Sequence, residues 1–142
     1  MSALAAMTLV AGSFISLPFA SNTYAVTPPD NCFAFNAGTG TITNYYYNEA
    51  NNSGNPACPN DVDIPSTIGG TGVTHIGHGA FSGNGLNTLT IPGSVNTIGA
   101  QAFMYNNLTS VSIPSSVTSI GVEAFANSGL ASVSIGSSVT SI

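Results

Sequence analysis

Three phenylalanines recur along the chain at a constant interval. Phe81, Phe103 and Phe125 are each 22 residues apart, and each closes the same phrase, in which Ile-Gly is followed by two variable residues and then Ala-Phe. A fixed period of this length is typical of repeat proteins, in which units stack because a single unit cannot bury its own apolar face. The interval therefore predicts a stack of similar coils, and it favours binding or display over catalysis.

Two strands are predicted within each unit. In the central unit, residues 95–98 form a short strand that ends at Gly99, because glycine adopts backbone angles that are closed to other residues. Residues 108–113 form the main strand, and Pro114 ends it. Between the two strands, residues 100–104 are predicted to form a single helical turn. The expected fold class is a mainly β repeat solenoid with parallel strands and single helical turns.

The main strand has a Leu-x-x-Leu-x-Leu pattern, with other aliphatic residues at some positions, that recurs at residues 86–91, 108–113 and 130–135. Alternation along a strand sends the aliphatic residues toward the core and the intervening hydroxyl residues outward. The outward positions predict two rows of hydroxyl groups, which are Thr88, Thr90, Ser110, Ser112, Ser132 and Ser134. These rows are the candidate ligand-binding face. The alternative is that they only keep an uncharged sheet hydrated.

The charge of the chain restricts its partners. The sequence contains no Lys or Arg, and its five acidic residues give a net charge of −5. Because contact with nucleic acid or with an anionic membrane surface depends on cationic side chains, both classes of partner are excluded. Glu123 is the only charged residue after position 63, so Ser, Thr and Asn must keep the repeats soluble.

Residues 1–25 have the features of a secretory signal peptide. An apolar run extends from Ala3 to Ala20, small residues follow it, and cleavage is expected after Ala25. A positively charged start is missing, which suggests that a basic stretch precedes Met1. The alternative is an uncleaved membrane anchor, because the run approaches the length that spans a bilayer. With the signal peptide as the favoured interpretation, we expect the chain to be secreted.

Residues 26–63 do not repeat, and we expect them to form an N-terminal cap. Residues 32–35 and 41–47 alternate like strands, and the turn residues between them predict a β-hairpin. Such a hairpin would cover the apolar end and the open strand edge of the first coil. The three tyrosines at positions 45–47 are interpreted as cap packing, with a platform for glycan or protein contact as the alternative.

Cys32 and Cys58 are the only cysteines, and an even number in an exported chain predicts a disulfide. Closing a loop of this length would stabilise the fold by about 3–4 kcal/mol. A shared metal ion would require two further ligands nearby, and a catalytic thiol would require a neighbouring base. The sequence around the two cysteines supplies neither.

Residues 64–142 are predicted to be the repeats. The first unit is five residues longer than the others, and the surplus lies in residues 67–72, a Gly-rich segment that is expected to form a surface loop. The last unit stops at Ile142, in the position of Ile98 and Ile120. Because a natural end should carry a polar cap, we expect the array, and a region that attaches it to the cell surface, to continue beyond this sequence.

Three phrases are characteristic of the repeated units. They are Ile113-Pro114-Ser115-Ser116-Val117-Thr118-Ser119-Ile120-Gly121, Glu123-Ala124-Phe125 and Leu108-Thr109-Ser110-Val111. In these phrases, three consecutive units over residues 62–142 resemble the BspA-type leucine-rich repeat family of bacterial surface proteins. The resemblance implies a curved, right-handed leucine-rich coil on an exported protein, and members are often implicated in adhesion to host proteins or to other bacteria.

The chain departs from the repeated pattern at two positions. Gly136 stands where Pro92 and Pro114 stand in the preceding units, and Ser128 stands where the sequence has Asn84 and Asn106. We expect the two asparagines to bond backbone groups at a tight turn between coils. The family shares no catalytic residues, so the resemblance carries none over to this chain.

Few other residues are candidates for chemistry. His75 and His78 are the only histidines, but the strand that carries them ends at Gly77 and no third metal ligand is evident. Asp61 and Asp63 form a close carboxylate pair, which is interpreted as a solvated loop before the first strand, with a weak calcium site as the alternative. No serine lies in a known nucleophile motif, and with no lysine the sequence lacks groups for acid–base catalysis.

Together these features predict a secreted or cell-surface adhesion protein that is not an enzyme and needs no cofactor. Its expected partner is a protein or glycan on a host or bacterial surface, and the mature domain is not expected to insert into a membrane. The alternative function is a structural spacer that displays another domain and binds no ligand.

Overall fold

The computed structural model describes residues 28–46 and 58–142, and the fold is given for these residues alone. The predicted signal peptide, the first two residues of the predicted cap and residues 47–57, which include the predicted loop, lie outside the described residues. Strands make up nearly all the regular structure, and the only helix of the described segments is the short 3-10 helix η1, Asp30–Cys32. No helix in these segments is long and apolar enough to span a membrane.

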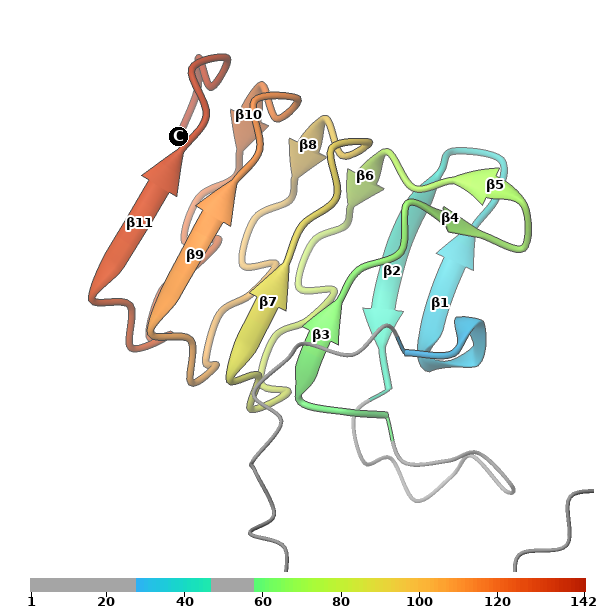
Figure 1. Ribbon diagram of the computed structural model, residues 1–142, viewed down its shortest axis with the longest axis horizontal. Coiled ribbons are helices and arrows are strands. Elements are labelled where there is room, and N and C mark those ends of the chain that lie inside the picture. Colours follow the sequence, from blue (N-terminus) through green and yellow to red (C-terminus); the bar gives the residue numbers. More distant parts are fainter. Residues whose placement is uncertain (1–27, 47–57) are drawn as a thin grey trace, which may run out of the picture.

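A five-stranded sheet runs along one side of the molecule in the order β1-β2-β6-β8-β10 (Figure 1). Its repeat strands come one from each unit and pair in parallel without any shift in register, so that Ile76 lies beside Ile98 and Ile98 beside Ile120. These are the predicted short strands, and each is two residues long: β6, His75–Ile76; β8, Thr97–Ile98; and β10, Ser119–Ile120.

The predicted main strands form a second row on the opposite side of the coils (Figure 1). β3 pairs in parallel with β7, β9 pairs in parallel with β11, and β7 lies beside β9. The strands of this row are β3, Asp61–Asp63; β7, Thr88–Thr90; β9, Ser110–Ile113; and β11, Ser132–Ile135.

A third set of backbone hydrogen bonds joins the turns of successive units. The N–H of Phe81 donates to the carbonyl of Ala102 at 2.8 Å, and one unit later the N–H of Phe103 donates to the carbonyl of Ala124 at the same distance. Successive units are therefore bonded on the short-strand side and at the turns, and the main strands extend the contact to the opposite side.

The predicted helical turn at residues 100–104 is wrong. Gln101 has a φ of 56° and Glu123, its equivalent in the next unit, has a φ of 58°. A right-handed helical turn cannot continue through a left-handed residue. The N–H groups of Ala102 and Met104 donate three residues back, to the carbonyls of Gly99 and Gln101, so the segment is a pair of tight turns. The N–H groups of Gln101 and Phe103 donate to the next unit, so these turns also serve stacking between units.

The glycine that follows each short strand has a different role from the predicted one. Gly77, Gly99 and Gly121 do not adopt a positive φ. They lie so close to the preceding coil that a Cβ atom at Gly99 would stand 2.7 Å from the carbonyl carbon of Gly77, and one at Gly121 would stand 2.3 Å from the nitrogen of Ala100. The Ile-Gly phrase therefore permits close backbone packing, not an unusual backbone angle.

A column of aromatic rings runs through the core. Phe81 and Phe103 stack with their centroids 5.1 Å apart, and Phe103 and Phe125 stack at the same separation. Tyr45, from the cap, continues the column by stacking on Phe81 at 5.1 Å, and Phe33 packs against both of these rings. The phenylalanine interval of the sequence is thus the interval of this column.

The cap is the predicted antiparallel hairpin, formed by β1, Phe33–Asn36, and β2, Thr41–Tyr45. β2 also pairs in parallel with β6, with Thr41 beside His75 and Ile42 beside Ile76, so that the cap enters the sheet in the same register as a repeat. This pairing covers the edge that the first coil would otherwise leave open.

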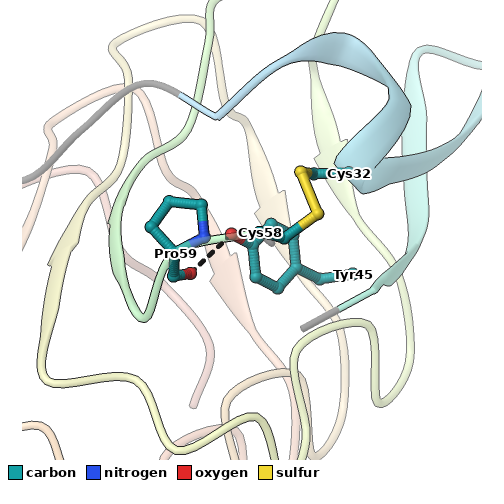
Figure 2. The surroundings of a disulfide bond; sticks show 4 residues. All are labelled: Cys32, Tyr45, Cys58 and Pro59. Carbon is teal, nitrogen blue, oxygen red and sulfur yellow. Dashed lines mark hydrogen bonds between the residues drawn. A yellow bond between two sulfur atoms is a disulfide. The ribbon is translucent and has the colours of Figure 1, made fainter. Parts of the chain in front are cut away.

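The predicted disulfide is confirmed. Cys32 and Cys58 are bonded, and both are buried (Figure 2). Beside them, the hydroxyl of Tyr45 donates to the carbonyl of Pro59 at 2.6 Å. Tyr45 is only 1% exposed, so the cap-packing interpretation holds for this tyrosine and the ligand-platform alternative does not.

The surplus of the first unit is a small hairpin formed by β4, Thr67–Ile68, and β5, Thr71–Gly72. Ile68 is buried, and the N–H of Gly69 donates to Oδ2 of Asp30 at 2.9 Å. The insertion therefore packs against the cap, whereas the sequence predicts a surface loop.

Buried polar side chains close the coils at the two predicted asparagines. Asn106 accepts from the N–H of Leu86 at 2.9 Å and donates to the carbonyls of Phe81 and Phe103 at 2.9 and 2.8 Å. Asn84 and Ser128 occupy the equivalent buried positions. The expected bonding of these asparagines to backbone groups is confirmed, and Asn106 links two units.

We predict that the Cys32→Ser/Cys58→Ser variant loses about 3–4 kcal/mol of unfolding free energy, because the disulfide limits the freedom of the unfolded chain. Tyr45→Phe is the matched comparison, since it keeps the ring and removes only the hydrogen bond to Pro59, at a cost of about 1 kcal/mol. Calorimetric unfolding measures both. An unchanged midpoint in the double serine variant would show that the bridge does not secure the cap.

The aromatic column gives a second prediction. Phe103→Ala should cost about 3–5 kcal/mol, because the ring is fully buried between two others. Phe125→Ala should cost less, since Phe125 is only partly buried. Equal losses in urea unfolding would contradict the expected dependence of each loss on the burial of the ring.

Candidate binding face

The side chains of β3, β7 and β9 alternate as the sequence predicts, whereas on β11 all four residues are exposed, with Val133 and Ile135 about half exposed. On β9, Val111 and Ile113 are buried while Ser110 and Ser112 are exposed. On β7, Leu89 is buried between the two threonines. The face that these strands turn outward is therefore built from short hydroxyl side chains over an aliphatic layer.

Strand pairing brings the predicted hydroxyl residues into two rows. Ser110 lies beside Ser132 and Ser112 lies beside Ser134, while Thr88 and Thr90 occupy the equivalent positions on β7. Neighbouring strands stand about 4.7–4.9 Å apart, and alternate residues along a strand are separated by about 6.5–7 Å. The face is thus a regular grid of groups that each donate and accept hydrogen bonds.

Asp61 and Asp63 extend the two rows at the cap end. The sequence interpretation placed them in a solvated loop, but they lie on β3, where Asp61 pairs with Thr88 and Asp63 with Thr90. Val62 between them is fully buried, so both carboxylates share the outer face. The signal was present in the sequence, because Asp-Val-Asp-Ile repeats the alternation of Thr-Leu-Thr-Ile at residues 88–91.

The hydroxyl of Thr88 donates to Oδ1 of Asp61 at 3.0 Å. This bond links the acidic end of the face to the first pair of hydroxyl residues. The face therefore carries negative charge at its cap end, on Asp61 and Asp63, and no charged residue lies on β7, β9 or β11.

The histidines are not part of the face. His75 lies on β6 in the other sheet, where its Nδ1 is 2.7 Å from the hydroxyl of Thr74, and His78 follows that strand. Across residues 28–46 and 58–142, no group of three or more His, Cys, Asp or Glu side chains is arranged to hold a metal ion. The serines of the face have neither histidine as a neighbouring base, so the arrangement favours hydrogen bonding over nucleophilic attack.

The family model for the BspA type leucine-rich repeat region matches residues 29–142, in six copies. The chain belongs to the BspA-type leucine-rich repeat family. The match extends the resemblance noted for residues 62–142 back into the cap, where β2 and β3 already pair in parallel with strands of the first long unit. No curated protein and no solved structure matches the chain.

BspA-type repeats are typical of bacterial surface proteins, and leucine-rich repeat domains generally mediate protein interactions and are not catalytic. Membership of the family therefore indicates an interaction or surface role for this chain. Membership of the BspA-type family gives no partner for the chain.

If the outward hydroxyl groups serve recognition and not folding, their removal should barely change stability. We predict that Ser112→Ala alters the unfolding free energy by no more than about 0.5 kcal/mol, because the side chain is exposed. Its neighbour Ile113 is buried, and Ile113→Ala should cost about 2–5 kcal/mol. Chemical denaturation of the two variants tests this, and a large loss in Ser112→Ala would contradict it.

Proposed function

We propose that this chain is an exported adhesion protein whose stacked units form a right-handed leucine-rich solenoid. Residues 1–25 direct export, residues 26–63 cap the array, and residues 64–142 carry the repeats. The protein is secreted and held at the cell surface, and it binds a host or bacterial surface protein or glycan without catalysing a reaction.

The observation that carries this proposal is the face formed by β3, β7, β9 and β11. The hydroxyl groups of β9 and β11 stand in register, the carboxylates of β3 stand in register with the threonines of β7, and buried aliphatic residues lie beneath β3, β7 and β9. Extended surfaces of stacked repeats are the usual place for partner contact. A partner that presents its own donors and acceptors at strand spacing can form many hydrogen bonds with this face.

The charge of the face restricts the kinds of partner surface that it can bind. Asp61 and Asp63 give its cap end a negative charge, and the chain has no Lys or Arg anywhere. An acidic partner would find no opposite charge to pair with, so the face favours neutral or basic surfaces.

Binding can be tested with a variant that blocks the rows without disturbing the core. In Ser110→Gln/Ser112→Gln, two exposed hydroxyl groups are replaced by longer polar side chains. Ser137→Gln is the matched control, because Ser137 is exposed in the turn after β11 and lies outside the face. The probes are immobilised extracellular-matrix proteins, a glycan array and intact bacterial cells.

We expect saturable binding by the unaltered chain to at least one probe. The double glutamine variant should bind about tenfold more weakly, since its side chains obstruct the centre of the face, and Ser137→Gln should bind normally. Absence of saturable binding to every probe would overturn the adhesion proposal and favour a spacer that displays another domain. Equal binding by both variants would place the contact elsewhere on the molecule.

A further inference from the structure

Tyr105 occupies a backbone position that suits other residues better. It lies in the turn between β8 and β9 with a φ of 56°, and the equivalent positions in the units before and after it are Gly83 and Asn127, with φ of 71° and 53°. Glycine and asparagine adopt this left-handed conformation most readily. A tyrosine there is the exception among the three, and the backbone gives no reason for it.

Core packing gives no reason for the tyrosine either. Tyr105 is 59% exposed, whereas Phe103, two residues earlier, is fully buried in the aromatic column. An aromatic ring that is both exposed and held in a disfavoured conformation does not serve the fold. Residues of this kind are concentrated at ligand contacts, where the strain has a functional purpose.

The backbone that carries the ring is firmly fixed. The N–H of Tyr105 donates to the carbonyl of Ala126 at 3.0 Å, and the carbonyl of Met104 accepts from the N–H of Gly83 at 2.9 Å. The side chain of Asn106 also donates to the carbonyl of Met104, at 3.3 Å. The turn is thus bonded to the units on both sides, so the backbone that carries the ring is fixed before any ligand arrives.

The neighbours of Tyr105 in the stack leave room for a ligand. Gly83 has no side chain to cover the ring, and an atom added at its Cβ position would meet nothing within 4 Å. On the other side, Asn127 places an exposed amide on the next unit. Tyr105 and Asn127 therefore present an aromatic surface and a neutral donor and acceptor on one side of the array.

We propose that Tyr105 and Asn127 form a binding site for a neutral glycan, separate from the sheet face. An aromatic ring packs against the C–H groups of a pyranose, and an amide both donates to and accepts from sugar hydroxyl groups. The absence of Lys and Arg and the net charge of −5 exclude favourable pairing with sialic or uronic acids. The class of ligand is therefore an uncharged oligosaccharide.

The test compares stability and binding in the same variants of the full chain. Tyr105→Asn supplies the residue that the neighbouring unit uses at this position, and Tyr105→Phe keeps the ring. The probes are immobilised neutral oligosaccharides that end in galactose, glucose or N-acetylglucosamine, together with sialylated forms of the same oligosaccharides. Ser137→Gln serves again as the control outside the site.

We expect the unaltered chain to bind at least one neutral probe and to bind its sialylated form more weakly. Tyr105→Asn should weaken that binding about tenfold while raising the thermal midpoint by about 2–8 °C, because asparagine relieves the left-handed strain. Tyr105→Phe and the control should bind the neutral probe nearly as well as the unaltered chain. Asn127→Gly, which keeps a favoured residue at the other position, should weaken binding without changing the midpoint.

The proposal is overturned if no neutral probe binds, if sialylated probes bind equally well, or if Tyr105→Asn leaves binding unchanged. The sheet-face variant Ser110→Gln/Ser112→Gln distinguishes the two proposals. If that variant abolishes glycan binding that Tyr105→Asn preserves, the glycan is held by the sheet face and the site at Tyr105 is wrong.

Discussion

Backbone hydrogen bonding from each unit to the next is the interaction on which the rest of this structure depends. The short strands and the turns direct their N–H and carbonyl groups to neighbouring units, and one unit alone would leave these groups unpaired. Strand pairing fixes neighbouring backbones about 4.7–4.9 Å apart, and the phenylalanine rings stack at 5.1 Å. The aromatic column therefore follows from the spacing of the backbone, and the glycines after the short strands allow that spacing.

The alternation of residues was enough to predict much of the fold and of the candidate face. It located the main strands, the buried aliphatic layer, the hairpin of the cap and the two hydroxyl rows, because a period of two is a direct consequence of strand geometry. The even number of cysteines predicted the disulfide that the structure contains. The sequence predicts a loop at Asp61 and Asp63 because the expected repeats begin at Ile64, whereas β3 contains both aspartates.

The turn at residues 100–104 could not be predicted in the same way. Gln101 and Glu123 are residues that favour helices, and nothing in their side chains reveals that both adopt a positive φ. Only Gly79, which occupies the equivalent position in the preceding unit and also has a positive φ, carries that information. Two of the hydrogen bonds of this turn, from the N–H groups of Gln101 and Phe103, run to a neighbouring unit, and no local pattern in the sequence could show those two.

The two candidate surfaces differ in how they repeat. Outward hydroxyl groups recur on β7, β9 and β11, so a partner that lies along these three strands meets the same kind of group on each. Tyr105 occurs in one unit only and replaces the glycine or asparagine of its neighbours. A repeated face suits extended contact of modest strength per unit, whereas a single exposed ring suits selection of one ligand.

The pairing of the cap hairpin with the first repeat strand also bears on how such a gene can change. β2 meets β6 in the register that β6 uses to meet β8, so the cap offers the array the same edge that any repeat offers. Recombination that adds or removes a block encoding 22 residues would thus restore the same junctions between neighbours. The length of the array can vary by whole coils over generations while the cap and its disulfide stay unchanged.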